Sequence, residues 1–213
     1  MTRSAFSMKA NVKGKIRVTI DIGEGKPYVF EETPFKVLER DNENVFLKLR
    51  SRKNLEYYVN KHYNSLRKRI EKDYLDWLDK PLVEFMNFLF EKNDPFYKDF
   101  LHKFGTKKFC KFELTDNSVF QQHGLYLYFM KGEIKYIGRC LDNFKERFNP
   151  GYGTITAKNC YKGGQSTNLH INSLMNRWGD SVKICLCPLV VPADEIKCLE
   201  TKMIAKVDPE WNR

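Results

Sequence analysis

The chain has 213 residues and a formal net charge of +10, with 42% hydrophobic and 14% aromatic side chains. This composition supports a hydrophobic core and excludes a disordered tail. No stretch approaches the roughly 20 consecutive apolar residues of a membrane helix, and residues 1–15 lack the apolar segment of a secretory signal. We therefore expect a cytoplasmic protein with no membrane partner, and its charge favours an anionic partner such as nucleic acid.

The first 120 residues are predicted to form a β-meander followed by helices. Apolar residues alternate with polar ones between residues 15 and 50, as in half-buried strands. From residue 51 to 79 the apolar spacing becomes helical. Residues 82–91 are predicted to form a second helix and residues 94–104 a short third one. We interpret this region, residues 1–120, as a DNA-binding part.

The second predicted region, residues 121–213, has the pattern of a separate α+β domain. Residues 124–130 and 134–138 are rich in strand formers and flank a Lys-Gly-Glu turn, which is typical of a β-hairpin. The elements expected after it are a short helix at 141–148, a helix at 169–178, a strand at 182–191 and a helix from 192 to about 206. The boundary between the two regions is expected near residues 116–121.

Two triplets on the predicted hairpin, Gly124-Leu125-Tyr126 and Tyr136-Ile137-Gly138, resemble the signature of the GIY-YIG endonuclease superfamily, with Leu in place of the first Ile. Arg147, Glu200 and a terminal Asn212 follow in the order that the superfamily shows. The resemblance covers the last two-fifths of the chain. It implies a three-stranded antiparallel sheet flanked by helices and a magnesium-dependent endonuclease activity.

The residue types at these positions suit phosphodiester hydrolysis. Glu200 is expected to hold the metal, Mg²⁺ or Mn²⁺, because hard cations of this kind take carboxylate oxygens. Arg147 stays charged and grips phosphate oxygens. Tyr136 is expected to act as a general base if its pKa is lowered, and Tyr126 to orient water or phosphate. The resemblance adds Asn212 to this catalytic set.

Glu200 also stands out without the family resemblance. It falls within an apolar helical stripe that includes Ile196, Leu199 and Met203. A carboxylate on a core-facing stripe is costly unless it is paired or bound to a metal. The alternative interpretation is a salt bridge at the edge of the core.

One position departs from the superfamily pattern. Many members carry His or Tyr one helical turn after the arginine, and here that position is Gly151. Tyr152 is the preferred substitute and is included among the catalytic residues, with His170 as the other candidate. The polar, Gly-rich residues 159–168 are expected to contact DNA or to form an ordinary connection.

The sequence therefore predicts a metal-dependent endonuclease that acts on double-stranded DNA. Its compact form resembles a type II restriction enzyme, while a repair or mobile-element nuclease of the same superfamily is the alternative within that class. A basic protein that binds nucleic acid without cleaving it, and a protein that binds an acidic partner, remain open. The sequence also leaves open whether the protein forms a homodimer. Arg67-Lys68-Arg69 is expected to contact DNA or to form a solvated basic face.

Overall fold

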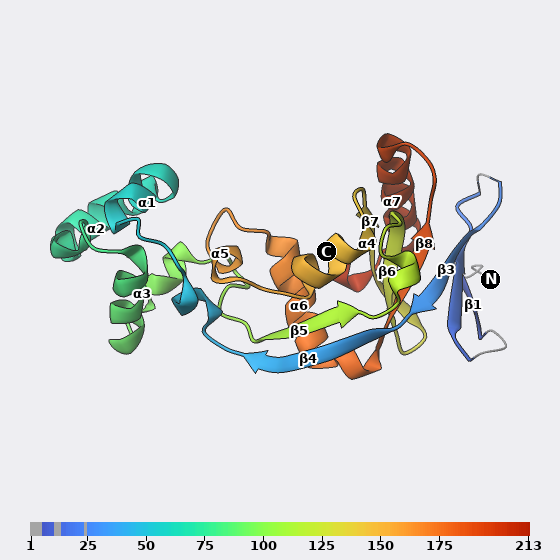
Figure 1. The fold of residues 1–213 in the computed structure, drawn as a ribbon. Helices are drawn as coiled ribbons and strands as arrows, with labels where there is room; N and C mark the ends of the chain where they lie inside the picture. The colour runs from blue at the N-terminus through green and yellow to red at the C-terminus, as the bar shows by residue number, and fades with distance from the viewer. Residues whose placement is uncertain (1–5, 11–13, 24) are drawn as a thin grey trace. The chain divides into compact units, whose positions relative to one another are not determined.

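The computed structural model describes residues 6–10, 14–23 and 25–213, and these form an α+β fold in two compact units (Figure 1). The segment considered above for a secretory signal thus lies partly outside the described residues. Unit 1 combines the described part of Met1–Leu38 with Lys111–Gly153 and Arg177–Arg213. Unit 2 combines Glu39–Cys110 with Thr154–Asn176. This division differs from the expected consecutive regions, because the chain passes between the units four times.

Unit 1 is built on a six-stranded antiparallel sheet with the order β1-β2-β3-β8-β6-β7. Its strands are β1 (Phe6–Ala10), β2 (Ile16–Ile20), β3 (Tyr28–Thr33), β6 (Gly124–Met130), β7 (Glu133–Cys140) and β8 (Val182–Pro188). The N-terminal meander joins the C-terminal hairpin because β3 pairs with β8, where Glu31 lies opposite Leu186. The meander therefore extends the C-terminal sheet and does not form a sheet of its own.

One face of this sheet packs against helix α7 (Ala193–Val207), which lies along β6 and β7 (Figure 1). Alternate residues of each strand point to opposite faces. The apolar core that joins the strands to α7 includes Val18, Phe30, Leu125, Leu127, Ile137, Cys185, Ile196, Leu199 and Met203. The intervening residues of β6, Tyr126 and Tyr128, therefore belong to the opposite face of the sheet.

The rest of unit 1 includes several short elements. They are α4 (Phe144–Glu146), a single π-helical turn (Arg147–Tyr152) and 3-10 turns at Asn117–Val119, Gly179–Ser181 and Glu210–Asn212. A second, two-stranded sheet pairs β4 (Phe35–Asn42) with β5 (Phe109–Leu114), and both strands carry the chain from one unit into the other. The sequence pattern did not predict β5.

Unit 2 is largely helical and has an aromatic core. Its helices are α1 (Leu55–His62), α2 (Arg67–Asp73), α3 (Leu82–Glu91), α5 (Ala157–Cys160) and α6 (Ser166–Trp178), and its 3-10 turns are Val45–Lys48, Asn64–Leu66, Leu75–Trp77 and Pro95–Phe100. The core includes Phe46, Leu55, Tyr63, Phe85, Leu89, Phe96, Phe100, Phe109 and Tyr161. Within the described residues, no helix is both long and apolar enough to cross a membrane.

The single helix expected over residues 51–79 is wrong, because the chain leaves helical geometry at Tyr63 and Tyr74. Tertiary contacts fix both residues. The Tyr63 hydroxyl donates to the Phe100 carbonyl at 3.0 Å, and the Tyr74 hydroxyl donates to the Asp94 carboxylate. The apolar residues that predicted one helix are thus divided among α1, α2 and the 3-10 turns beside them.

Candidate active site

Three tyrosines lie together on the sheet face opposite α7. Tyr126 and Tyr128 come from β6 and Tyr136 from β7, and all three are buried. The rings of Tyr126 and Tyr136 lie 6.2 Å apart in a stacked arrangement, and Phe148 packs edge-on against Tyr126 at 5.0 Å. The alternation of the hairpin therefore collects phenol groups on one face and aliphatic groups on the other.

Each of the two triplets requires its glycine for a different structural reason. Gly124 adopts a φ of +142°, and a Cβ atom there would overlap the Cys187 carbonyl of the neighbouring strand. Gly138 lies directly opposite Tyr126, and a Cβ atom at this position would overlap the Tyr126 phenol. The last residue of the second triplet thus has to be glycine, because the Tyr126 ring lies over it.

The π-helical turn explains the departure at Gly151. In an α-helix the residue one turn beyond Arg147 is Gly151, whereas a π-helix closes its turn one residue later. The segment Arg147–Tyr152 is π-helical, and the Arg147 guanidinium donates to the Tyr152 hydroxyl at 2.6 Å. Tyr152 therefore lies one turn from Arg147 in this chain. The helix expected at 141–148 does not stop at Asn149-Pro150-Gly151, since these residues form part of the π turn.

Hydrogen bonds join Arg147 and three tyrosine hydroxyls into one network. Arg147 Nε donates to the Tyr126 hydroxyl at 3.1 Å, and the Tyr126 and Tyr152 hydroxyls are 2.7 Å apart. The Tyr136 hydroxyl lies 3.3 Å from that of Tyr152. The Arg147 guanidinium also lies over the Tyr152 ring at 4.3 Å. Within the described residues Arg147 Nη1 forms no hydrogen bond, so one edge of the fixed guanidinium keeps its donors.

Glu200 lies on the buried stripe of α7, as the sequence pattern predicts, and only 9% of its surface is exposed. Its carboxylate accepts a hydrogen bond from the Arg139 guanidinium on β7. The sequence pattern did not identify Arg139 as the partner of Glu200. Its place directly after the second triplet was the available signal. The salt bridge considered as the alternative for Glu200 is therefore present.

Electrostatic coupling links Glu200 to the tyrosine network. Burial raises the pKa of the Glu200 carboxyl above its usual 4.5, although Arg139 and Arg147 both act to lower it. Glu200 in turn contributes to the raised pKa of Tyr136. The carboxylate, Arg147 and the phenol of Tyr136 thus act on one another. Although two cations lie nearby, they do not fully offset the cost of burying the Glu200 carboxylate.

The pKa of Tyr136 moves in the direction opposite to the one that a general base requires. Burial raises it well above 10, and the neighbouring Tyr152 adds to the effect, while Arg147 lowers it only in part. Burial also raises the pKa of Tyr126. The phenols are therefore protonated at neutral pH, and each can donate a hydrogen bond. The expectation of a lowered Tyr136 pKa is not met by the protein side chains alone.

Asn212 has a positioning contact and does not reach the network. Its side-chain amide donates to the Ile137 carbonyl at 2.8 Å and accepts from the Ile137 amide at 2.9 Å. Lys135 adds a second link between β7 and the C-terminal turn through Glu210, at 2.9 Å. Asn212 thus fixes the strand that carries Tyr136 and Arg139.

Two further residues complete the comparison with the sequence. His170, the other candidate for the position of Tyr152, belongs to unit 2, where its ring stacks on Phe104 at 4.6 Å. Tyr128 is completely buried beside Tyr136 and Tyr152, and among the described residues its hydroxyl has no hydrogen-bond partner. No signal in the sequence distinguished Tyr128 from its neighbours.

Arg147 and three phenols from β6, β7 and the π turn therefore form one hydrogen-bonded network, and the Glu200–Arg139 pair between α7 and β7 is coupled to it electrostatically. No group of three or more His, Cys, Asp or Glu residues suited to a metal ion occurs among the described residues. No protein-family model matches the chain, and no match to a curated protein or to a solved structure was found.

Proposed function

We propose that unit 1 is a metal-dependent endonuclease domain of the GIY-YIG type that hydrolyses double-stranded DNA. The observation that carries this proposal is the network of Arg147 with Tyr126, Tyr136 and Tyr152, coupled to the buried carboxylate of Glu200. The arrangement of β8, β6 and β7, with β6 in the middle, supports the three-stranded core that the resemblance implies. A restriction-type role is proposed as the subclass.

Glu200 fits a single hard cation. Mg²⁺ typically takes one or two carboxylates and completes its shell with waters and phosphate oxygens, so one buried carboxylate is a sufficient protein donor. Burial leaves this carboxylate poorly neutralised by Arg139 and Arg147, and a divalent cation would offset that cost. Glu200 would hold the ion, Mg²⁺ or Mn²⁺, which when bound supplies Lewis-acid activation of water and of the phosphate.

The other residues would bind and orient the phosphate. Arg147 is held on two sides by the Tyr126 and Tyr152 hydroxyls and keeps donors on its third nitrogen for phosphate oxygens. A guanidinium fixed before the substrate arrives stabilises developing negative charge without reorganising. Tyr136, protonated at neutral pH, would donate a hydrogen bond to the attacking water or to a phosphate oxygen.

Cleavage of supercoiled plasmid DNA tests the proposal. The wild-type protein is expected to nick or linearise the plasmid with magnesium and to leave it intact with excess chelator. Glu200→Gln keeps the size of the side chain and one acceptor oxygen but removes its charge, so cleavage should be lost while DNA binding in chelator persists. Binding without cleavage by the wild type, across magnesium and manganese, would favour a protein that only binds nucleic acid.

A further inference from the structure

Unit 2 contains a cavity of about 650 Å³ that the proposed nuclease chemistry does not use. Its walls come from residues 45–51, 58–63 and 155–164, and all three segments belong to unit 2. The volume falls within the roughly 300–1,000 Å³ that small-molecule sites occupy. The last segment includes most of the polar, Gly-rich run that the sequence singled out as a DNA contact or an ordinary connection.

Three of the residues that line the cavity are tyrosines, and each is held in place through its hydroxyl group. Tyr58 donates to Ser51 Oγ at 2.8 Å, and Tyr161 donates to the Phe46 carbonyl at 3.0 Å. Tyr63, which bonds to the Phe100 carbonyl, lines the same cavity. Burial raises the pKa values of Tyr63 and Tyr161, so these walls stay uncharged at neutral pH. Tyr63 and Tyr161 are only 3% and 6% exposed, so the half-buried Tyr58 is the most accessible of the three tyrosines to a flat ring system.

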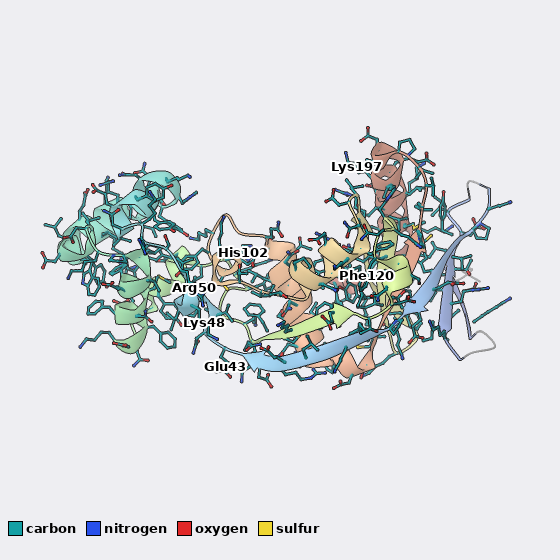
Figure 2. All side chains as sticks on the ribbon, in the orientation of Figure 1. Glu43, Lys48, Arg50, His102, Phe120 and Lys197 are labelled. Atoms are coloured by element: carbon teal, nitrogen blue, oxygen red, sulfur yellow. The ribbon has the colours of Figure 1, made fainter. Side chains whose placement is uncertain are left out.

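The charged residues that line the cavity are all basic. Lys48, Arg50, Lys158 and Lys162 contribute to it, all four are exposed, and no Asp or Glu is among the lining residues. Figure 2 labels Lys48 and Arg50 on the segment between β4 and α1. None of the four takes part in an ion pair within the described part of the chain. Their charges are thus available to an anion.

We propose that this cavity binds a single nucleotide, with the base against the tyrosine walls and the phosphate at the basic residues. An apolar, aromatic interior with cations at its margin matches that division between a flat ring and a charged group. The nucleotide could be free in solution or displaced from a DNA strand. Binding of a nucleotide displaced from DNA rests on the proposed function, whereas binding of a free nucleotide does not require it.

Equilibrium binding to the full-length protein in chelator tests the proposal, with two kinds of probe. The first is the set of four free deoxynucleoside 5′-monophosphates, followed by calorimetry. The second is a 20-base-pair duplex with one mismatch, compared with its fully paired form by fluorescence anisotropy. A mispaired base leaves the stack at lower cost, so a displaced nucleotide predicts tighter binding of the mismatched duplex. Binding of a monophosphate shows instead that the cavity takes a nucleotide that is free in solution.

Two variants separate a binding site from general positive charge. Arg50→Glu with Lys158→Glu reverses two of the basic residues. The matched control, Lys92→Glu with Lys107→Glu, makes the same charge change at exposed positions of unit 2 outside the cavity. The cavity variant should weaken monophosphate binding, or abolish the mismatch preference, by about tenfold or more, because charge-assisted contacts to phosphate are lost. The control should change it less than about twofold.

A third variant tests the interior without altering charge. Leu49→Trp adds a large ring to a half-buried wall residue, so it should block the base and weaken binding while the protein melts at a similar temperature. The proposal is overturned if no probe binds, or if the cavity variants bind like the control. Wild-type plasmid cleavage is measured separately, so failure here is distinct from failure of the nuclease proposal.

Discussion

The tyrosines of the two units are buried in different ways. In unit 2, Tyr63 and Tyr161 each donate to one backbone carbonyl, at 3.0 Å in both cases. In unit 1, Tyr126 and Tyr136 both bond to the Tyr152 hydroxyl, and Tyr126 and Tyr152 also accept from Arg147. A backbone-bonded phenol satisfies its own hydroxyl and fixes a ring. A phenol in the unit 1 network helps to hold a buried cation in one orientation.

This difference distinguishes packing from chemistry among residues that look alike in the sequence. Loss of a hydroxyl bonded to a carbonyl costs the hydrogen bond, about 1–3 kcal/mol when the partner is left buried. Loss of a hydroxyl that orients Arg147 also frees a guanidinium that the proposed reaction requires in place. The two kinds of tyrosine should therefore respond differently to the same substitution.

The largest effect is expected for Arg147→Lys. Lysine keeps the charge but carries three donors on a single nitrogen, so a lysine that bonded both Tyr126 and Tyr152 could not also offer phosphate the paired donors of a guanidinium. The cleavage rate at saturating enzyme should fall by about 10²–10³-fold, the range seen when one preorganised donor to a reacting oxyanion is removed. Single-turnover cleavage of a plasmid measures it. Arg177→Lys, on α6, serves as the control, and equal losses in the two variants would contradict the assignment.

A matched pair of Tyr→Phe variants tests the comparison itself. Tyr152→Phe removes the hydroxyl that contacts Tyr126, Tyr136 and Arg147, and the cleavage rate should fall by about 10–100-fold. Within the described part of the chain, Tyr161→Phe removes a hydroxyl that donates to the Phe46 carbonyl, and its cleavage rate should stay within about twofold of wild type. Rates and thermal unfolding are measured for both. Similar cleavage losses would remove the distinction between the two units.

Asn212→Ala should have a smaller effect on cleavage and a clear effect on stability. The substitution leaves the amide and carbonyl of Ile137 without their side-chain partner, at a cost of about 1–3 kcal/mol. Urea unfolding measures the loss. Because the residue acts through β7, cleavage should decline by less than about tenfold. A loss as large as that of Arg147→Lys, with unchanged stability, would assign Asn212 a direct catalytic role.

Glu200 is expected to destabilise the metal-free fold at neutral pH. Its folded-state pKa is raised above 4.5, so the folded protein binds this proton more tightly than the unfolded chain. That contribution to stability is full below about pH 4.5 and is lost as the pH rises through the raised value. Glu200→Gln cannot ionise, so its stability relative to wild type should increase over the same window. Urea unfolding in chelator from pH 4 to pH 7 tests the trend, and a decrease would contradict it.

The elements that the sequence predicted well have strong periodic patterns. The strand at Gly124–Met130 and the helices at Leu82–Glu91 and Ala193–Val207 are confirmed nearly residue for residue. The pairing of β3 with β8 joins residues more than 150 positions apart, and no local pattern specifies such a partner. The division into consecutive regions assumed that neighbours in sequence fold together, which this sheet does not obey.

The sequence predicted which residues belong to the candidate site better than it predicted the contacts between them. The resemblance to the superfamily signature pointed to Tyr126, Tyr136, Arg147 and Tyr152, which share one network. The π turn that brings Tyr152 beside Arg147 depends on backbone geometry that no residue count reveals. The pairing of Glu200 with Arg139 and the raised pKa of Tyr136 follow from burial across two elements, and burial is fixed only by the complete fold.

A double-mutant cycle between Glu200 and Arg147 tests most directly whether the two residues form one active site. Single-turnover cleavage is measured for wild type, Glu200→Gln, Arg147→Lys and the double variant, with magnesium and saturating enzyme. Residues that act as a unit lose activity non-additively. The cleavage rate of the double variant should therefore lie within about threefold of the rate of the slower single variant. Fully multiplicative losses, or cleavage at the wild-type rate by either single variant, would contradict a shared site.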